Sequence, residues 1–279
     1  MKESSSLSPA TEPWAVILGC SAGTGAAIAH AVARDPGLHI FGIHRGQHPD
    51  SAAAVEADTI AAKRRVILRT DEAGTEESAA RGAEAILQAV GRTQVRLFVH
   101  SIANASIGPL VAGRGQVLSA RQIEKTFDSM AHSFVYWVRE LVARDLLAPG
   151  ARLLGLTNPI GDSLVSGLGL IAAAKAALEI YVRQLAVELG PRGYRVNLLN
   201  FGLVDTAAGR IAFPPEIWER VKARASRVTP ARRLCTVEEV GRFVSLLAGD
   251  ATEWFNSATI DFTGGMTHSL LGTVLNQEE

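Results

Sequence analysis

The sequence is poor in cysteine, with only Cys20 and Cys235 among 279 residues. Two distant thiols provide neither a disulfide framework nor a zinc site with metal-ligand spacing, which points to a reducing compartment and hence to a cytoplasmic protein. Excess charge of one sign is also absent, because 28 lysines and arginines balance 28 aspartates and glutamates. A chain without a basic field is not expected to bind nucleic acid or an anionic membrane surface.

A long uninterrupted apolar run is missing as well. The most apolar stretch, residues 164–182, contains Lys175 and Glu179, so we interpret it as a buried helix and not as a membrane span. The first 13 residues are rich in serine and proline and lack the apolar run of a signal peptide. We therefore expect residues 1–13 to be a disordered leader and residues 14–279 to form a single domain.

Short apolar runs alternate with helical patterns through that domain. The runs are almost continuously apolar, which is typical of strands in a parallel sheet that is covered on both faces. The sequence thus predicts an α/β fold of the Rossmann type, a doubly wound seven-stranded parallel sheet with helices on both faces. The predicted strands are 14–18, 38–43, 65–68, 95–99, 151–156, 195–199 and 257–261, and the predicted helices are 26–34, 51–62, 75–90, 120–147, 170–189 and 236–247.

A glycine-rich loop follows the first predicted strand and opens the first helix. At such a turn, free backbone N–H groups and the helix dipole can bind a diphosphate, and glycines let it approach the backbone. The spacing is Gly-x3-Gly-x-Gly, and a tight turn without a ligand is the alternative interpretation. We assign the loop to the binding of a nicotinamide dinucleotide, with contacts from Gly19, Ser21, Gly23, Thr24 and Gly25.

The end of the second strand favours NADPH over NADH. A carboxylate there would bind the ribose hydroxyls of NADH, but the sequence has His44 and Arg45 and no acid before Asp50. A guanidinium can bind a 2′-phosphate with two hydrogen bonds. The alternative is that Arg45 is a solvated surface residue.

Several further segments resemble the short-chain dehydrogenase/reductase superfamily, and within it most closely the enoyl-acyl-carrier-protein reductases. With the glycine loop, these segments are His100–Ala103, Ser133–Val135, Lys175–Glu179, Gly190–Asn197, Gly202–Thr206 and Asp261–Gly265. The resemblance implies cofactor contacts from Ser101, Ile102, Ala103, Asp71 near the adenine, Lys175 on the nicotinamide ribose and Thr206 near the carboxamide. Asp71 could equally be a turn residue, and Thr206 a helix N-cap. The resemblance also implies a homotetramer or homodimer, in which the helix over 170–189 would be a pairing surface.

One expected residue of that family is absent. The resemblance implies a tyrosine that transfers the proton, placed four or seven residues before the lysine, where this chain has Ile171 and Leu168. At the end of the fifth strand, Thr157 and Asn158 stand where the enoyl reductases have a Ser-Tyr pair. We therefore name Lys175, Thr157, Asn158 and His132 as candidate catalytic residues. For His132 alone, a half-buried helix residue is the favoured alternative.

Three functions stay open at this stage. The first is an atypical NADPH-dependent reductase of an enone, enoyl thioester or ketone, in which a polar side chain, a water molecule or the substrate supplies the proton. The second is a non-redox enzyme on the same fold, such as a cyclase, isomerase or dehydratase. The third is a catalytically silent binding protein, which would have no need of Lys175 or the glycine loop.

Residues 206–230 have the length and proline content of a helical substrate lid. Seven basic residues lie between positions 210 and 233, against Glu216 and Glu219. Such a segment beside an active site could dock an acyl carrier protein or the phosphopantetheine arm of a carrier-bound acyl substrate, although a solvated helix face is an equal alternative.

Overall fold

The computed structural model describes residues 13–111, 116–161, 164–212 and 214–269. The predicted leader therefore lies outside the described residues, except for Pro13. Parallel strands form one seven-stranded sheet in the order β3-β2-β1-β4-β5-β6-β7, which confirms the predicted fold class. The strands are β1 (Trp14–Leu18), β2 (His39–His44), β3 (Val66–Thr70), β4 (Val95–His100), β5 (Leu147–Thr157), β6 (Arg195–Phe201) and β7 (Thr259–Phe262).

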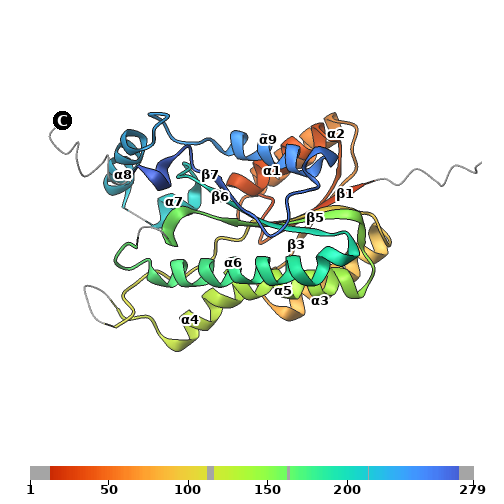
Figure 1. Ribbon diagram of the computed structural model, residues 1–279, viewed down its shortest axis with the longest axis horizontal. Helices are drawn as coiled ribbons and strands as arrows, with labels where there is room; N and C mark the ends of the chain where they lie inside the picture. The colour runs from red at the N-terminus through yellow and green to blue at the C-terminus, as the bar shows by residue number, and fades with distance from the viewer. Residues whose placement is uncertain (1–12, 112–115, 162–163, 213, 270–279) are drawn as a thin grey trace, which may run out of the picture.

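Helices cover both faces of this sheet. Figure 1 shows α3, α5 and α6 on one side and α1, α2 and α9 on the other. The helices are α1 (Gly23–Arg34), α2 (Pro49–Ala61), α3 (Glu76–Ala89), α4 (Ala120–Phe127), α5 (Ser133–Ala143), α6 (Gly169–Leu189), α7 (Ala207–Ala212), α8 (Pro215–Val228) and α9 (Val237–Ala248). Short segments η1 (Asp128–His132), η2 (Pro159–Gly161), η3 (Gly190–Arg192), η4 (Asp250–Thr252) and η5 (Met266–His268) lie between or after them.

The continuous apolar runs of the sequence follow from this layering. In β1 all five residues are buried, with Trp14, Val16 and Leu18 in the core beneath α3, α5 and α6, and Ala15 and Ile17 in the core beneath α1 and α9. Alternate residues of a strand point to opposite faces, so a strand in a two-sided sheet must be apolar throughout.

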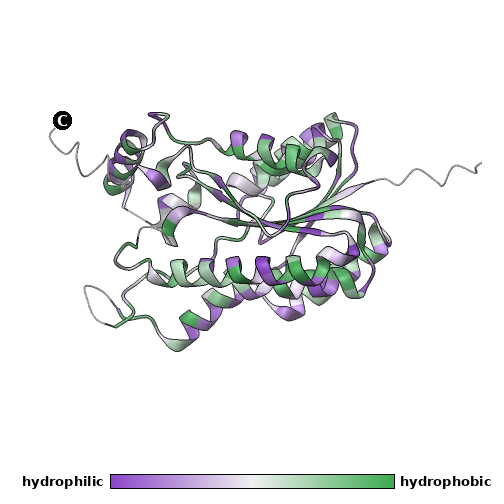
Figure 2. Cartoon of the chain, viewed as in Figure 1, coloured by the Kyte–Doolittle hydropathy of each residue, from purple (hydrophilic) through white to green (hydrophobic). Residues whose placement is uncertain are grey.

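The flanking helices bury one side only. Along α3 the buried residues are Ser78, Ala79, Gly82, Ala83 and Ile86, which recur with the spacing of one helix face. Figure 2 shows the same division, since hydrophobic and hydrophilic residues alternate along each flanking helix. No helix within the described ranges has the length and hydropathy needed to cross a bilayer.

The predicted helix over 120–147 is wrong in two respects. A π-helical segment, η1, separates α4 from α5, and the helix ends at Ala143 because the next strand begins at Leu147. The hydroxyl of Ser129 donates to the carbonyl oxygens of Asn104 and Lys125, at 2.6 and 2.9 Å. Side-chain hydroxyls that bond to carbonyls of the preceding turn slightly destabilise and bend a helix, and the π segment lies where Ser129 makes such a bond.

Candidate functional site

The loop between β1 and α1 closes tightly around its glycines. Gly19 has a φ of +78°, and a Cβ at this position would overlap with the carbonyl oxygen of Ser101. A Cβ on Gly25 would in turn overlap with the carbonyl oxygen of Gly19. Both positions require glycine, so the loop presents bare backbone at the carboxyl end of β1.

The first turn of α1 has no side-chain acceptor of its own. Its N-cap, Ala22, makes no capping hydrogen bond, and no acidic residue lies in the first turn. The first N–H groups of a helix lack intrahelical partners and carry the positive end of the helix dipole. The arrangement fits the diphosphate of a dinucleotide. Ser21 and Thr24 belong to this turn, and Thr206 contacts it, with its Cγ2 3.3 Å from the position of a Cβ on Gly23.

The residues after β4 border the same loop. The backbone N–H of Ser101 donates to the carbonyl oxygen of Leu18 at 3.1 Å, and its side chain lies beside Gly25. Ile102 packs against the core under α6, whereas Ala103 is exposed. The structure thus brings Ser101 to the glycines, and Ile102 and Ala103 follow it along the chain away from β4.

Residues expected at the adenosine end gather where β2 and β3 finish. Arg45 is exposed directly after β2, and the N–H of Gly46 donates to Nδ1 of His44 at 3.1 Å. Partial burial lowers the pKa of His44, so that its ring stays a neutral acceptor at neutral pH. The N–H of Asp71 donates to the carbonyl oxygen of His44 at 3.0 Å, which places all three residues together.

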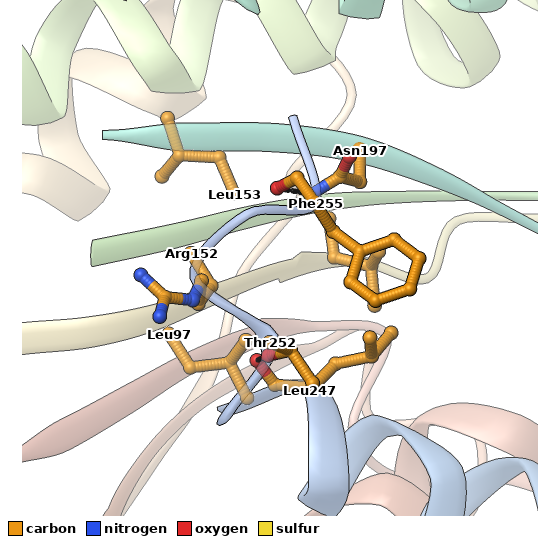
Figure 3. A pocket seen from close by; sticks show the side chains of 8 residues that line it. Leu97, Arg152, Leu153, Asn197, Leu247, Thr252 and Phe255 are labelled. Carbon is orange, nitrogen blue, oxygen red and sulfur yellow. Dashed lines mark hydrogen bonds between the residues drawn. The ribbon is translucent and has the colours of Figure 1, made fainter. Parts of the chain in front are cut away.

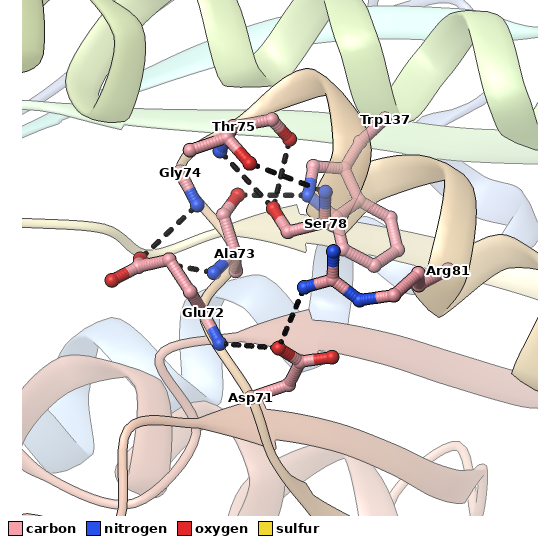
Figure 4. A network of polar contacts seen from close by, with 8 residues as sticks. All are labelled: Asp71, Glu72, Ala73, Gly74, Thr75, Ser78, Arg81 and Trp137. Atoms are coloured by element: carbon pink, nitrogen blue, oxygen red, sulfur yellow. Dashed lines mark hydrogen bonds and ion pairs between the residues drawn. The ribbon is translucent and has the colours of Figure 1, made fainter.

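Asp71 belongs to a hydrogen-bonded loop after β3. Its Oδ1 accepts from Arg81 at 3.0 Å and from the N–H of Glu72 at 2.8 Å (Figure 4). Glu72 closes the next turn, and the indole of Trp137 donates to the carbonyl oxygen of Ala73 at 2.9 Å. One oxygen of Asp71 is therefore engaged within the protein, and the loop that carries it is well anchored.

Lys175 lies inside the protein on α6. Its Nζ donates to the carbonyl oxygen of Leu156 at 2.6 Å, near the carboxyl end of β5. Burial lowers the pKa of Lys175 to about 8. The ammonium group of Lys175 therefore loses its proton within one or two pH units of neutrality.

Thr157 and Asn158 lie next to that contact. Thr157 is the last residue of β5 and is 8% exposed, whereas Asn158 is exposed. The two positions at which a tyrosine was expected hold apolar side chains, Leu168 at the N-cap of α6 and Ile171 in its first turn. Three candidate catalytic residues are thus brought together, without a phenol at either expected position.

His132 takes a different direction. Its Nδ1 lies 3.0 Å from the hydroxyl of Tyr181, and its ring is tilted against those of Phe127, Tyr136 and Tyr181. The hydroxyl of Tyr136 donates to Asp128, and Tyr194 lies beneath the guanidinium of Arg192. The structure places His132 in an aromatic cluster between η1 and α6, and its hydrogen bond does not run to Lys175.

Two site residues were not predicted from the sequence, His100 and Asn200. His100 is fully buried at the end of β4, with Nε2 2.7 Å from the hydroxyl of Ser133, and its Nδ1 has no partner among the described residues. Burial and, secondly, the charge of Lys175 lower the pKa of His100 to about 3. Asn200, beside Thr157 in β6, is 8% exposed with its Oδ1 unpartnered. The sequence did contain a signal for both residues, namely a polar residue at or near the end of an otherwise apolar strand.

The predicted lid is held by Asp205. Its Oδ1 accepts from Nε of Arg210 at 2.9 Å and from the indole of Trp218 at 3.1 Å, and its Oδ2 accepts from Lys222 at 3.1 Å. These hydrogen bonds, that of Arg210 first, lower the pKa of Asp205 to about 2. One carboxylate therefore joins α7 and α8 to the loop after β6, and Figure 1 shows both helices at the end toward which the strands point.

The basic residues of the lid divide into two groups. Arg210 and Lys222 bind Asp205, and Arg233 binds Glu239. Exposed arginines without an acidic partner among the described residues follow one another along α8, namely Arg220, Arg224 and Arg227.

Two hollows lie near the amino ends of the strands, away from the glycine loop. One of about 10 Å³ is lined by Arg152, Asn197, Thr252 and apolar side chains (Figure 3). That volume admits a single water molecule. A hollow of about 280 Å³ borders Pro13 and Arg96. Parallel sheets bind ligands outside the carboxyl ends of their strands, so neither is the expected site. Nor do the described ranges contain three His, Cys, Asp or Glu side chains grouped to hold a metal ion.

Comparison with known proteins shows the family to which the chain belongs. A family model described as enoyl-(acyl carrier protein) reductase matches residues 19–267. The enoyl-acyl-carrier-protein reductase (NADH) FabI of Escherichia coli is 29% identical over 170 residues, which cover 61% of this chain and 63% of the E. coli protein. The 1-cyclohexenylcarbonyl-CoA reductase of Streptomyces collinus is 25% identical over 254 residues, or 90% of this chain and 86% of the relative.

Solved structures share the fold. A short-chain dehydrogenase of Burkholderia cenocepacia in complex with NADP superposes with a TM-score of 0.78, covering 92% of this chain and 98% of its own. The two sequences are 22% identical. This likeness extends to the whole layered arrangement of sheet and helices.

Proposed function

Because the chain belongs to the enoyl-(acyl carrier protein) reductase family of the short-chain dehydrogenase/reductase superfamily, we propose that it is an NADPH-dependent reductase with an atypical proton donor. The observation that carries the proposal is the glycine loop, where the backbone of Ser101 excludes any side chain at Gly19 and the first turn of α1 has no side-chain acceptor. A binding protein of another kind has no physical need for a glycine loop that leads into the free N–H groups of a helix.

This loop is the proposed binding site of NADPH. The diphosphate would bind at the N-terminus of α1, Arg45 would pair with the 2′-phosphate, and Lys175 would hold the nicotinamide ribose. Ser101, Ile102, Ala103, Asp71 and Thr206 would complete the contacts. Bound there, NADPH supplies a hydride. The Burkholderia structure contains NADP, whereas the E. coli relative is named for NADH, so the choice between them depends on Arg45.

The proposed substrate is an enone, an enoyl thioester or a ketone. Both named relatives reduce an unsaturated acyl thioester, in which an alkene is conjugated to a carbonyl. Thr157, Asn158 and Lys175 lie together at the end of β5, where hydrogen bonds to that carbonyl oxygen would stabilise its developing negative charge. His132 is a remaining candidate donor, which would have to act from within its contact with Tyr181.

A carrier protein and a second copy of the chain are the proposed partners. Arg220, Arg224 and Arg227, which have no acidic partner among the described residues, form a basic stripe on the lid that suits an acidic acyl carrier protein. Ile180 and Val187 on α6 are 57% and 70% exposed, which supports pairing of this helix in a homotetramer or homodimer. With free thiols and these partners, we place the protein in the cytoplasm.

A non-redox reaction is the second candidate. It is favoured by Leu168 and Ile171, because neither side chain can transfer a proton. Deuteride transfer separates the two functions: with NADPH labelled at C4, the reductase incorporates deuterium at the β-carbon of an enoyl thioester or at the carbonyl carbon of a ketone. Turnover of these substrates without label would replace the reductase by an isomerase, dehydratase or cyclase.

A further inference from the structure

The cavity of about 10 Å³ near the amino ends of the strands is lined by a buried arginine with an unused donor. Arg152 is 6% exposed, and its two Nη atoms donate to the carbonyl oxygens of Gly150 and Gly249. Its Nε has no partner among the described residues. Because a guanidinium is planar and stays protonated, the direction of this N–H group is fixed by the heavy atoms around it.

The amide of Asn197 lines the same cavity and supplies a second donor. Asn197 is also 6% exposed; its Oδ1 accepts from the N–H of Ala258 at 3.0 Å, and its Nδ2 donates to the carbonyl oxygen of Phe255 at 2.8 Å. These two bonds fix the orientation of the amide. An amide nitrogen carries two N–H groups, and among the described residues only one of them has an acceptor. Two unused N–H groups therefore belong to the side chains that surround one small cavity (Figure 3).

Positive charge gathers around Arg152. A Cβ on Gly150 would lie 3.0 Å from Nη1 of Arg96 and 3.7 Å from Nη1 of Arg152, so these two guanidiniums are close neighbours. Arg195 is the register partner of Arg152 in β6, which places both side chains on the same face of the sheet. Burial and, secondly, the charges of Arg96 and Arg195 lower the pKa of Arg152.

The acidic residues nearby do not balance this charge. Asp250 binds Arg96, and its carboxylate is 91% exposed. Arg195 donates to the backbone carbonyl of Glu253 at 2.6 Å, and within the described ranges neither Arg152 nor Arg195 has a carboxylate partner. A buried charge is costly unless an opposite charge pairs with it. One negative charge beside Arg152 would remove this imbalance.

We propose that the cavity binds a single monovalent anion of the halide class, which accepts from Nε of Arg152 and from the unused N–H of Asn197. The volume is that of one particle about as large as water, which excludes phosphate, sulfate and larger anions. Chloride is somewhat larger than water. Phe255, which is 46% exposed, is the lining side chain that can move outward to admit it.

A water molecule is the competing occupant. It could accept from the same two donors, but it would leave the charge of Arg152 uncompensated and would need acceptors for its own protons. Oδ1 of Asn197 is already engaged by Ala258, so the hydroxyl of Thr252 is the remaining side-chain acceptor of the lining. An anion needs no acceptor and supplies the missing charge.

The proposed anion acts on stability and is independent of the proposed reaction. Its partners belong to β5 and β6, and the cavity is closed by η4 and by the end of α9 through Thr252 and Leu247. The ion would thus join the sheet to the helical layer at the end remote from the glycine loop. We expect it to raise the free energy of unfolding.

Urea unfolding in sodium chloride, compared with sodium gluconate of the same ionic strength, tests the proposal with screening held constant. If chloride binds only the folded protein, the unfolding constant falls about tenfold when chloride reaches ten times its dissociation constant. Arg152→Met should lose this dependence, and Arg92→Met, which removes an exposed arginine just before β4, should keep it. A wild-type protein without the dependence, or an equal dependence in Arg152→Met, would overturn the proposal.

Arg195→Gln tests the site without altering its lining, and it serves even if Arg152→Met does not fold. Losing a neighbouring positive charge should weaken chloride binding several-fold, and an unchanged chloride dependence would contradict the proposed role of charge. Wild-type crystals soaked in sodium bromide then locate the ion, because bromide scatters anomalously. We expect an anomalous peak in the cavity. Density without anomalous signal would mean a single water molecule only, and bromide bound only elsewhere would likewise refute the site.

Discussion

The carbonyl oxygen of Ser101 occupies the position that a Cβ on Gly19 would need. This contact joins the ends of β1 and β4, two neighbouring strands, at the point where the sheet meets α1. It holds the glycine loop against the end of β4, beside the N-terminus of α1.

Gly19→Ala should destabilise the protein more than a positive φ alone explains. Gly193 has a φ of +85° with nothing within 4 Å of an added Cβ, so Gly193→Ala measures the conformational cost, about 1 kcal/mol. The overlap with Ser101 should add about 2 kcal/mol at Gly19. Urea unfolding of the two variants compares these costs. Equal losses would show that the loop can relax away from Ser101.

Arg45→Ala should erode the preference for NADPH over NADH by about 1–3 kcal/mol, the scale of a charge-assisted hydrogen bond. Titration of both nucleotides by fluorescence measures the preference, with Arg121→Ala on α4 as a control of equal charge. Affinity for NADH should stay the same in both variants. If the preference survives in Arg45→Ala, another group binds the 2′-phosphate.

Lys175 should make the stability of the protein depend on alkaline pH. Its pKa is lowered from 10.5 to about 8, so between these values the unfolded chain binds more protons than the folded protein. The free energy of unfolding contributed by this group therefore rises from pH 8 to pH 10.5, by about 3 kcal/mol in total. Lys175→Met should lack this rise when urea unfolding is followed across the range. A parallel pH dependence in both proteins would contradict the burial of the charge.

Asp205→Asn should release the lid. The amide cannot replace the carboxylate for Arg210 and Lys222 at once, so α7 and α8 should open more often, and trypsin should cleave within residues 207–228 roughly fivefold faster, the equivalent of about 1 kcal/mol. Asp250→Asn, which removes an exposed partner of Arg96, is the matched control. Equal cleavage of both variants would mean that Asp205 does not restrain the lid.

Most of the fold could be predicted because the apolar pattern and the glycines act locally. The strand over 14–18 was predicted with its observed bounds, and the helix over 170–189 began one residue late. The π segment within 120–147 coincides with a non-local contact, the hydrogen bond from Ser129 to Asn104, 25 residues earlier. Periodicity along one helix carries no sign of such a contact.

The site was predicted only in part for the same reason. The spacing of Gly19 and Gly25 identifies them in the sequence. The unpartnered Nδ1 of His100 can be recognised only in the structure, which shows Nε2 in contact with Ser133. The direction of His132 likewise depended on Tyr181, which lies 49 residues later in the chain. The sequence therefore does not predict which polar side chains form pairs across the core.

The π segment also sets the rotation, about the helix axis, of the residues that follow it. A wider turn holds one residue more than an α-helical turn, so Ser133 and Trp137 are rotated by roughly 100° from where an uninterrupted helix would put them. Only in this phase does the indole of Trp137 fit over Gly82, where no Cβ could be accommodated. Deleting one residue from 128–132 would therefore move the indole away from Gly82 and break the contact between Ser133 and His100. This stretch should tolerate substitutions far better than changes of length.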